Sequence, residues 1–293
     1  MTDMKKGLLI SGGIVLLLVA YLFLLSRRTI VIKVYSSCNL AAAGRCFTDT
    51  AQWAARWPQN DGRTYRITGV FYNHLAVAIR CSDGAVLNGN IRLVPLSSDT
   101  TAISWECRGP VLFMHRAEVR RDMEAVLQSF KAFVDDDKNI YGVHFYRTMS
   151  KITTLASITN ISATYPTTDE VYRKIDSLRV YIIGHGAAAV DSPWLNVTKM
   201  PDGLFHTTVA IPTNKLVPEN GRIANKRFVP WKMIQGDVRG GIYTVEKAFE
   251  QMRKFKLDHP MTIVAIPFQT LITDRRKEQD TTKWVTIVAA PIS

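Results

Sequence analysis

The histidines and cysteines of this chain are its most versatile chemical groups, because imidazole and thiolate bind metals and act as bases or nucleophiles. Six histidines are dispersed among the 293 residues, and the four cysteines form no C-x-x-C pair. The sequence has no H-E-x-x-H, G-x-S-x-G or phosphate-loop motif. This spacing predicts no metal site, no catalytic group and no cofactor. Free thiols are the simplest interpretation of Cys38, Cys46, Cys81 and Cys107, although an oxidising compartment would allow a disulfide.

One glycine-rich segment, GHGAAA at residues 184–189, has the spacing of a dinucleotide-binding loop. Such a loop needs a full helix directly after it, whose backbone N–H groups point at the pyrophosphate. Pro193 stands only four residues beyond Ala189 and interrupts any such helix. We therefore expect a helix end and a turn here.

The net charge of +12 raises the question of nucleic acid binding, since Lys and Arg neutralise phosphates. The basic residues are scattered in short groups such as Arg120-Arg121 and Arg253-Lys254, without a helix-turn-helix or RNA-binding signature. We expect a solvated basic surface and no nucleic-acid partner. For a chain tethered to a bilayer, anionic lipid headgroups are the nearer partner of these charges.

An uncharged apolar segment, residues 7–26, opens the chain. About twenty residues at ~1.5 Å each span a hydrocarbon core of roughly 30 Å. The alternative is a cleaved signal peptide, whose apolar core is usually about 7 to 15 residues and ends at small residues. We expect an uncleaved transmembrane helix within residues 1–27. Its orientation stays open because basic residues flank both ends: Lys5, Lys6, Arg27, Arg28 and Lys33.

The elements of a first domain follow at residues 28–135. A strand at 28–35 precedes a helical stretch at 40–57, which Pro58 ends. Four strand-like segments separated by turns come next: TYRITGVFYN, LAVAIRCS, VLNGNIRLVPL and TAISWECRG. Residues 115–134 then show apolar side chains at helical spacing, so this last helix must lie on the sheet.

A strand, a helix ending in DTAQWAARWP, an antiparallel meander and a long closing helix resemble the helix-grip, START-like fold of the SRPBCC family, which includes polyketide cyclases and lipid-transfer proteins. The resemblance implies a cavity between the sheet and the long helix, and no particular reaction. Trp53, Trp57, Trp105 and His74 are candidates to line that cavity. Each is also readily explained as a core or rim residue.

Residues 139–293 contain an internal repeat. A helical pattern begins at Val171 and the strand PWLNVT follows 22 residues later; a second helical pattern begins at Val245 and PFQTLIT follows 22 residues later. Thr167 and Glu170 form a capping box before the first helix. Each unit therefore reads strand, helix, strand, strand.

The last strand of each unit ends on a proline, HTTVAIP at Pro212 and VTIVAAP at Pro291. The chain as a whole is predicted to be an α+β protein. It has an N-terminal transmembrane helix, a helix-grip antiparallel sheet domain and a duplicated βαββ domain.

The two βαββ units resemble the gyrase-inhibitor-like (GyrI-like) small-molecule-binding domain, which is also the effector-binding half of multidrug-responsive transcription activators. GGIYTVEKAFEQM, IPFQTLITDRRK and KWVTIVAAPI carry the match. The resemblance covers residues 139–293 and implies a partly aromatic pocket in the groove where the two units meet about a pseudo-twofold axis.

The predicted ligand-binding residues are aromatic because such side chains bury much apolar area with few rotamers to freeze. Pseudo-symmetry pairs Trp194 with Phe268 and Phe205 with Trp284, while two others lie near the start of the second helix. The predicted set is Trp194, Phe205, Phe268, Trp284, Tyr243 and Trp231. The alternative, that these rings fill the core beneath the helices, stays open.

One departure from the GyrI-like pattern concerns charge. Family members often place a glutamate on the last strand, where it balances a cationic ligand, but residues 283–288 carry no acid. The nearest carboxylates, expected to face solvent, are Glu246, Glu250, Asp274 and Glu278. Because a buried cation without a counter-charge is costly, a neutral or anionic ligand is predicted.

The resulting prediction is a single-pass protein, of a bacterial inner membrane as this combination suggests. It would bind a small apolar or amphipathic molecule for sensing, sequestration or transfer. A hydrolase or cyclase acting on a lipophilic substrate is the alternative, favoured if Glu246 or Glu250 lies in the cleft beside an aromatic ring. A scaffold with filled pockets is a third possibility. Transcriptional control is not expected, since no DNA-binding module precedes the effector-type domain.

Overall fold

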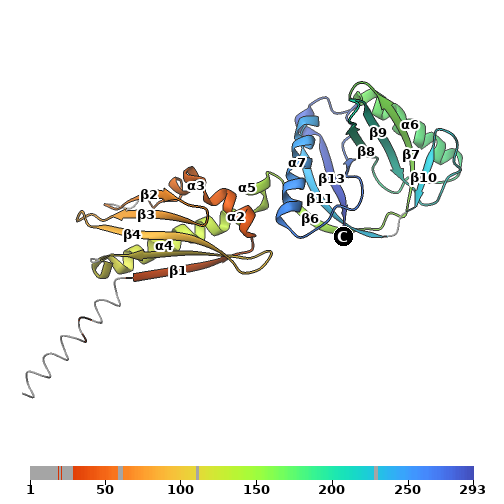
Figure 1. Ribbon diagram of the computed structural model, residues 1–293. Coiled ribbons are helices and arrows are strands. Elements are labelled where there is room, and N and C mark those ends of the chain that lie inside the picture. Colours follow the sequence, from red (N-terminus) through yellow and green to blue (C-terminus); the bar gives the residue numbers. More distant parts are fainter. Residues whose placement is uncertain (1–18, 20, 22–28, 59–61, 110–111, 228–229) are drawn as a thin grey trace, which may run out of the picture. The chain divides into compact units, whose positions relative to one another are not determined.

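The chain divides after Asp136 into two units, each a mixed α+β structure built on one antiparallel sheet (Figure 1). The computed structural model describes residues 19, 21, 29–58, 62–109, 112–227 and 230–293. Among these residues, no helix is long and apolar enough to cross a membrane. The predicted span at residues 7–26 lies outside the described residues, apart from Val19 and Tyr21.

The first unit follows the order of elements predicted from the sequence. Its strands and helices are β1 (Thr29–Ser36), α2 (Leu40–Phe47), α3 (Thr50–Ala54), β2 (Thr64–Val70), β3 (His74–Arg80), β4 (Val86–Pro95), β5 (Thr101–Arg108) and α4 (Leu112–Val134). The sheet has the order β1-β5-β4-β3-β2 with every pair antiparallel. Helix α4 packs against β1 and β5, so its apolar stripe does lie on the sheet (Figure 1).

The helix predicted over residues 40–57 is two short helices instead of one. Asn39 caps α2, with its side chain accepting a hydrogen bond from Ala42 N, and Asp49 caps α3 through Ala51 N. The Asp49 carboxylate offers the backbone a new helix start, which competes with continuation of α2. Prediction of a single helix was therefore wrong at this point.

Aromatic rings fill the space between the helices and the sheet of the first unit. Trp53 and Trp105 have no exposed surface. The Trp53 ring stacks on Phe130 with centroids 4.3 Å apart, and Phe47 meets it edge-on at 5.5 Å. The Trp53 indole N–H donates to the Phe47 carbonyl at 2.7 Å. Trp53 and Trp105 are therefore core residues, which was one of the two interpretations that the sequence allowed.

His74 lies apart from those rings. It stacks on Phe71 with centroids 4.3 Å apart and is only half-buried, at the start of β3. Trp57 is also half-buried and stacks on Tyr65 with centroids 5.5 Å apart.

The second unit begins with a short helix and continues through an eight-stranded sheet. Its elements are α5 (Asp137–Tyr141), β6 (Phe145–Ser150), β7 (Thr154–Ser162), α6 (Thr168–Gly184), β8 (Trp194–Lys199), β9 (Phe205–Pro212), β10 (Ala224–Arg227), β11 (Trp231–Arg239), α7 (Ile242–Asp258), β12 (Phe268–Leu271), η1 (Thr281–Lys283) and β13 (Val285–Ile292). The sheet order β10-β7-β9-β8-β12-β13-β11-β6 has equivalent strands at equal distances from the central β8/β12 pair. Helix α6 packs on β7 and β9, and α7 packs on β11 and β13.

The repeat read from the sequence is visible in the positions of these elements. Helices α6 and α7 are both 17 residues long, and their starts, like those of β8 and β12, are 74 residues apart. Each half also has one matching isolated bridge, Ala189 with Thr213 and Ile263 with Ile292. The capping box of Thr167 forms, and GHGAAA is a helix end and turn in which Gly186 has φ +66°.

The halves exchange their edge strands, which the sequence did not indicate. The extended stretch before α6 is split into β6 and β7; β7 stays with the first half, while β6 pairs with β11 of the second. In return β10, which precedes β11 in sequence, pairs with β7. Tertiary packing decides which distant strands pair, and local residue patterns do not encode it.

Candidate functional site

Strand alternation separates the two faces of the second sheet. Leu195, Val209 and Ile211 pack with the apolar face of α6. Because successive side chains point to opposite faces, their neighbours Trp194 and Ala210 face away from the helices, together with Phe268. The face opposite the helices therefore carries its own apolar cluster.

An apolar hollow with a volume of about 170 Å³ lies on that face, where the two halves meet. The rings of Trp194 and Phe268 stack there with centroids 4.0 Å apart and an angle of 19° between their planes. They come from the adjacent strands β8 and β12, whose register pairs Trp194 with Thr270. Trp231, at the start of β11, lines the same hollow.

The polar groups of the hollow are few and carry no negative charge. Asn196, Thr208 and Lys226 contribute to the lining, which includes no aspartate or glutamate. Asn196 Nδ2 donates to the Pro267 carbonyl at 2.8 Å and its Oδ1 accepts from Thr198 Oγ1 at 3.1 Å, which leaves the second amide hydrogen as a donor. Lys226 is exposed on the edge strand β10. The arrangement suits an apolar body with a neutral or negative end.

The remaining predicted residues lie elsewhere in the second unit. Tyr243 and Trp284 line an open depression at the start of α7, and Tyr243 is 78% exposed. The Trp284 indole N–H donates to the Glu278 carbonyl at 2.8 Å. Phe205 packs edge-on against Tyr165 with centroids 5.7 Å apart. The structure thus brings Trp194, Phe268 and Trp231 together at the hollow. Tyr243, Trp284 and Phe205 do not line it.

A second, more polar cleft of about 470 Å³ lies on the helix side, between α7 and β8. Glu246 and Glu250 of α7 line it, exposed as predicted, together with Tyr165. Burial raises the pKa of the Tyr165 hydroxyl, and the negative charge of Glu246 raises it further. Tyr165 therefore stays a protonated hydrogen-bond donor at neutral pH.

A buried arginine lies on the helix side of the same sheet. Arg275 is 9% exposed, and its Nη2 donates to Gln269 Oε1 and Thr286 Oγ1, both at 3.0 Å. The guanidinium also stands over the Trp284 ring, 4.9 Å from its centroid. No carboxylate of the described residues forms an ion pair with it. Burial lowers the pKa of Arg275, but a guanidinium still carries its charge at neutral pH.

Sequence reasoning missed the polar and aliphatic residues of the hollow, including Asn196, Lys226 and Pro291. Asn196 could have been predicted, because period-two alternation in PWLNVT places it on the same face as Trp194. Lys226 was not, since β10 reaches this site only through the exchange of edge strands.

The sequence matches no protein-family model and no curated protein. Several solved structures are similar to parts of the chain. The EcmrR C-terminal domain is 12% identical, with 52% of this chain and 98% of that chain covered and a TM-score of 0.44. A hydrolase from Listeria innocua is 12% identical, with 50% and 91% covered and a TM-score of 0.37. SAV2435 bound to tetraphenylphosphonium is 11% identical, with 51% and 94% covered and a TM-score of 0.34.

At identities of 11–12% and TM-scores of 0.44 or less, these similarities do not assign the chain to a family. The hollow beside Trp194 and Phe268 is therefore interpreted from its own geometry, as a site shaped for a small apolar group.

Proposed function

We propose that the second unit binds a small apolar or amphipathic molecule, neutral or anionic, in the hollow beside the stacked Trp194 and Phe268. The observation that carries this proposal is the combination of two stacked rings with an open apolar space next to them. An open hollow lined by apolar atoms leaves that apolar surface in contact with water, which is unfavourable. An apolar ligand removes that surface from water.

The size of the hollow limits the ligand. Its volume of about 170 Å³ is close to that of an engineered cavity of ~150 Å³ that takes up benzene. One ring or a short branched chain fits within it. A longer or amphipathic molecule would seat only its apolar end there, with its polar end near Asn196 or Lys226.

Charge decides between ligand classes. A cation in this hollow would lose hydration without gaining a carboxylate, since the lining has none and Lys226 is positive. A carboxylate or sulfonate end would instead meet Lys226 and the amide of Asn196. A neutral or anionic ligand is therefore favoured over a cationic drug.

The proposal also includes a domain type for each unit and a membrane anchor. Residues 28–135 are a START-like domain and residues 139–293 a GyrI-like domain, as the element order of each supports. The uncharged segment at residues 7–26 anchors the chain in a membrane. Together they describe a protein that senses, sequesters or transfers an apolar compound at a bilayer surface.

The test of ligand binding uses the full chain in detergent micelles. Native mass spectrometry identifies molecules that co-purify, and displacement of an anionic naphthalene sulfonate probe is compared with uptake of tetraphenylphosphonium. We expect the anionic probe to bind more tightly. Trp194→Ala and Phe268→Ala should each weaken its binding at least about tenfold, corresponding to ~1.4 kcal/mol.

Tyr243→Ala is the matched aromatic control, because Tyr243 lies in the separate depression and is 78% exposed. Its affinity for the anionic probe should equal that of the wild type. Equal affinity in Trp194→Ala as well, with the fold intact by circular dichroism, would remove the hollow as the site.

Anchoring is tested separately. The full chain should stay in the membrane pellet after an alkaline carbonate wash, and deletion of residues 1–27 should release it. Recovery of the full chain in the wash supernatant contradicts the anchor and leaves the ligand proposal intact.

One observation favours a second candidate function, hydrolysis of a lipophilic ester. Glu246 lines the polar cleft beside Tyr165, whose protonated hydroxyl can donate to a carboxylate or to a developing oxyanion. Turnover of nitrophenyl esters that is lost in Glu246→Gln but kept in Glu250→Gln would support this function. Equal rates in both variants and the wild type would exclude Glu246 as the base.

A further inference from the structure

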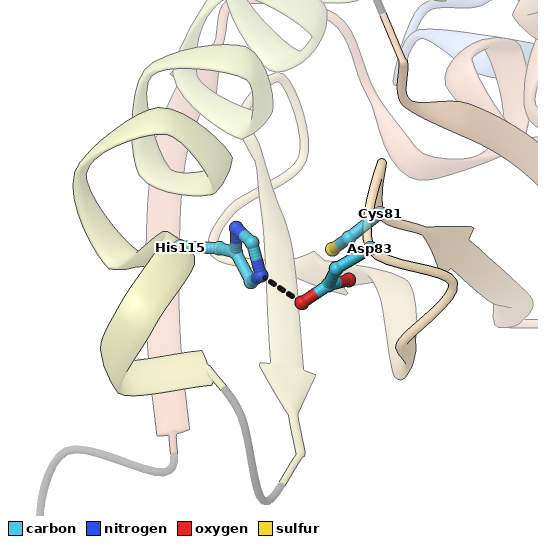
Figure 2. A group of neighbouring side chains, drawn as sticks. All are labelled: Cys81, Asp83 and His115. Atoms are coloured by element: carbon cyan, nitrogen blue, oxygen red, sulfur yellow. Dashed lines mark hydrogen bonds and ion pairs between the residues drawn. The ribbon is translucent and has the colours of Figure 1, made fainter.

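Two side chains next to the turn after β3 and one from the distant helix α4 converge at one end of the first unit. Cys81 follows β3, Asp83 lies in the turn between β3 and β4, and His115 lies near the start of α4 (Figure 2). One ligand atom from each, a thiol sulfur, a carboxylate oxygen and an imidazole nitrogen, all lie within 4.8 Å of one another. His115 Nε2 is 3.0 Å from Asp83 Oδ2.

The hairpin turn holds two of these groups in place. Cys81 N donates to the Ala85 carbonyl at 2.8 Å and Gly84 N donates to the Cys81 carbonyl at 3.0 Å, which closes the turn. Gly84 has φ +82°, a conformation that favours glycine. Asp83 Oδ1 accepts a hydrogen bond from Ala85 N at 2.9 Å, so Oδ2 is directed at His115.

We propose that Cys81, Asp83 and His115 form a binding site for a divalent transition metal ion of borderline softness, with zinc(II) as the best match. Thiolate, imidazole and carboxylate are the three ligand types that zinc accepts in proteins. Three protein ligands leave one tetrahedral position for water or another molecule.

The distances are close to those a bound ion requires. Ligand atoms at about 2.0–2.3 Å from a tetrahedral ion are roughly 3.3–3.7 Å from one another. The three atoms, within 4.8 Å of one another, need to move by about 1 Å at most.

Charge balance also favours a divalent ion. On binding, the Cys81 thiol releases its proton to solvent, so that a thiolate, a carboxylate and a neutral imidazole surround the metal. Two negative charges then neutralise the two positive charges of the ion. Neutrality matters most at Cys81, which is 3% exposed, whereas the Asp83 side chain is 43% exposed and stays in contact with water.

The rival interpretation is a hydrogen bond between His115 and Asp83 that fastens the turn to α4, with Cys81 as a bystander. That bond needs no thiol, whereas the sulfur lies beside both groups (Figure 2). The two interpretations differ in whether sulfur contacts an added metal ion, which is directly measurable.

The experiment titrates the full chain in detergent micelles with cobalt(II), which reports thiolate ligation through a near-ultraviolet charge-transfer band. We expect one equivalent to produce this band and zinc(II) to abolish it by displacement. Cys81→Ser should remove the band. His115→Gln and Asp83→Asn should lower cobalt affinity by more than the roughly tenfold that loss of even an outer-shell partner causes.

Cys38→Ser is the matched control, since its thiol is buried in the same unit but stands outside the cluster. It should keep the band. A band that is absent from the wild type, persists in Cys81→Ser or disappears in Cys38→Ser overturns the proposal. X-ray absorption of the zinc-loaded wild type needs no variant, and a first shell without sulfur refutes the site even if Cys81→Ser does not fold.

Discussion

The two units of this protein use tryptophan in different ways. In the first unit Trp53 has Phe130 stacked on it and Phe47 against its edge, and none of its surface is exposed. In the second unit Trp194 stacks on Phe268 and lines a hollow of about 170 Å³. The residue type is the same. What differs is whether other side chains complete the packing around the ring: they do so around Trp53, whereas Trp194, although 7% exposed, borders open space.

The two units also differ in how their buried charged side chains are paired. In the first unit Asp122, 2% exposed, accepts hydrogen bonds from Arg63 at 2.9 Å and from the Tyr65 hydroxyl at 2.6 Å. In the second unit the partners of Arg275 in the described structure are neutral: Gln269, Thr286 and the Trp284 ring. The first unit neutralises its buried charge internally. In the second unit Arg275 keeps its charge without an ionic partner among the described residues, on the sheet face opposite the hollow.

The largest difference between the units should come from truncating Trp53. Trp53→Ala leaves a void beneath Phe130 and should destabilise the first unit by about 3–5 kcal/mol. Hydrogen exchange read peptide by peptide in the full chain reports each unit separately. Trp53→Phe, which keeps a ring but loses the hydrogen bond to the Phe47 carbonyl, should cost less. Equal losses would mean that the stack contributes little.

A second, slightly smaller effect concerns the buried ion pair. Asp122→Asn leaves the Arg63 guanidinium, whose side chain is 10% exposed, without its buried charge partner and should cost roughly 3 kcal/mol. Glu118→Gln is the control, because Glu118 pairs with the same arginine at 2.6 Å but is 53% exposed. Its loss should be within about 1 kcal/mol. Urea unfolding followed on peptides of the first unit measures both.

Local patterns in the sequence predicted most elements of both units because each has a clear period. The stripe on α4 at Val119, Met123 and Val126 is buried, and the equal spacing of α6 and α7 follows the repeat. Local patterns failed where pairing is tertiary, in the exchange of β6 and β10 between halves. They also failed at Asp49, where one capping side chain divides a helix.

The candidate sites were harder to predict from the sequence than the fold. Trp194 and Phe268 were predicted as a pair because they occupy equivalent repeat positions, but the same argument also paired Phe205 with Trp284. The cluster of Cys81, Asp83 and His115 was missed altogether, and no metal was expected. Its histidine follows 34 residues after the cysteine and reaches it only because α4 packs back on the sheet. No motif spacing encodes such a contact.

Truncation of Trp194 should have a moderate effect on stability. Trp194→Ala removes a ring that borders an existing hollow, so fewer contacts are lost than in the first unit, and we expect about 2 kcal/mol. A small apolar probe at saturation should stabilise the wild type and leave the variant unchanged. The measurement is exchange of the second-unit peptides with and without probe. A loss as large as that of Trp53→Ala would contradict the contrast between core and pocket.

The smallest effect is a pH dependence confined to the first unit. Burial alone would raise the pKa of the Asp135 carboxyl, but hydrogen bonds from Lys131 Nζ at 2.5 Å and Ser36 Oγ at 2.6 Å, with the Lys131 charge, hold it below its ordinary value. A lowered folded-state pKa means that stabilisation is complete above the unfolded pKa of about 3.9 and is lost as pH falls through the folded value.

Asp135→Asn removes that titration. Its stability deficit relative to the wild type, read from urea midpoints of first-unit peptides, should be largest at neutral pH and shrink in acid below about pH 4. Peptides of the second unit should show no difference between the two proteins at any pH. If the deficit stays constant in acid, the hydrogen bonds of Asp135 stabilise the first unit equally in both protonation states. The charge of this carboxylate then contributes nothing to the stability of the first unit.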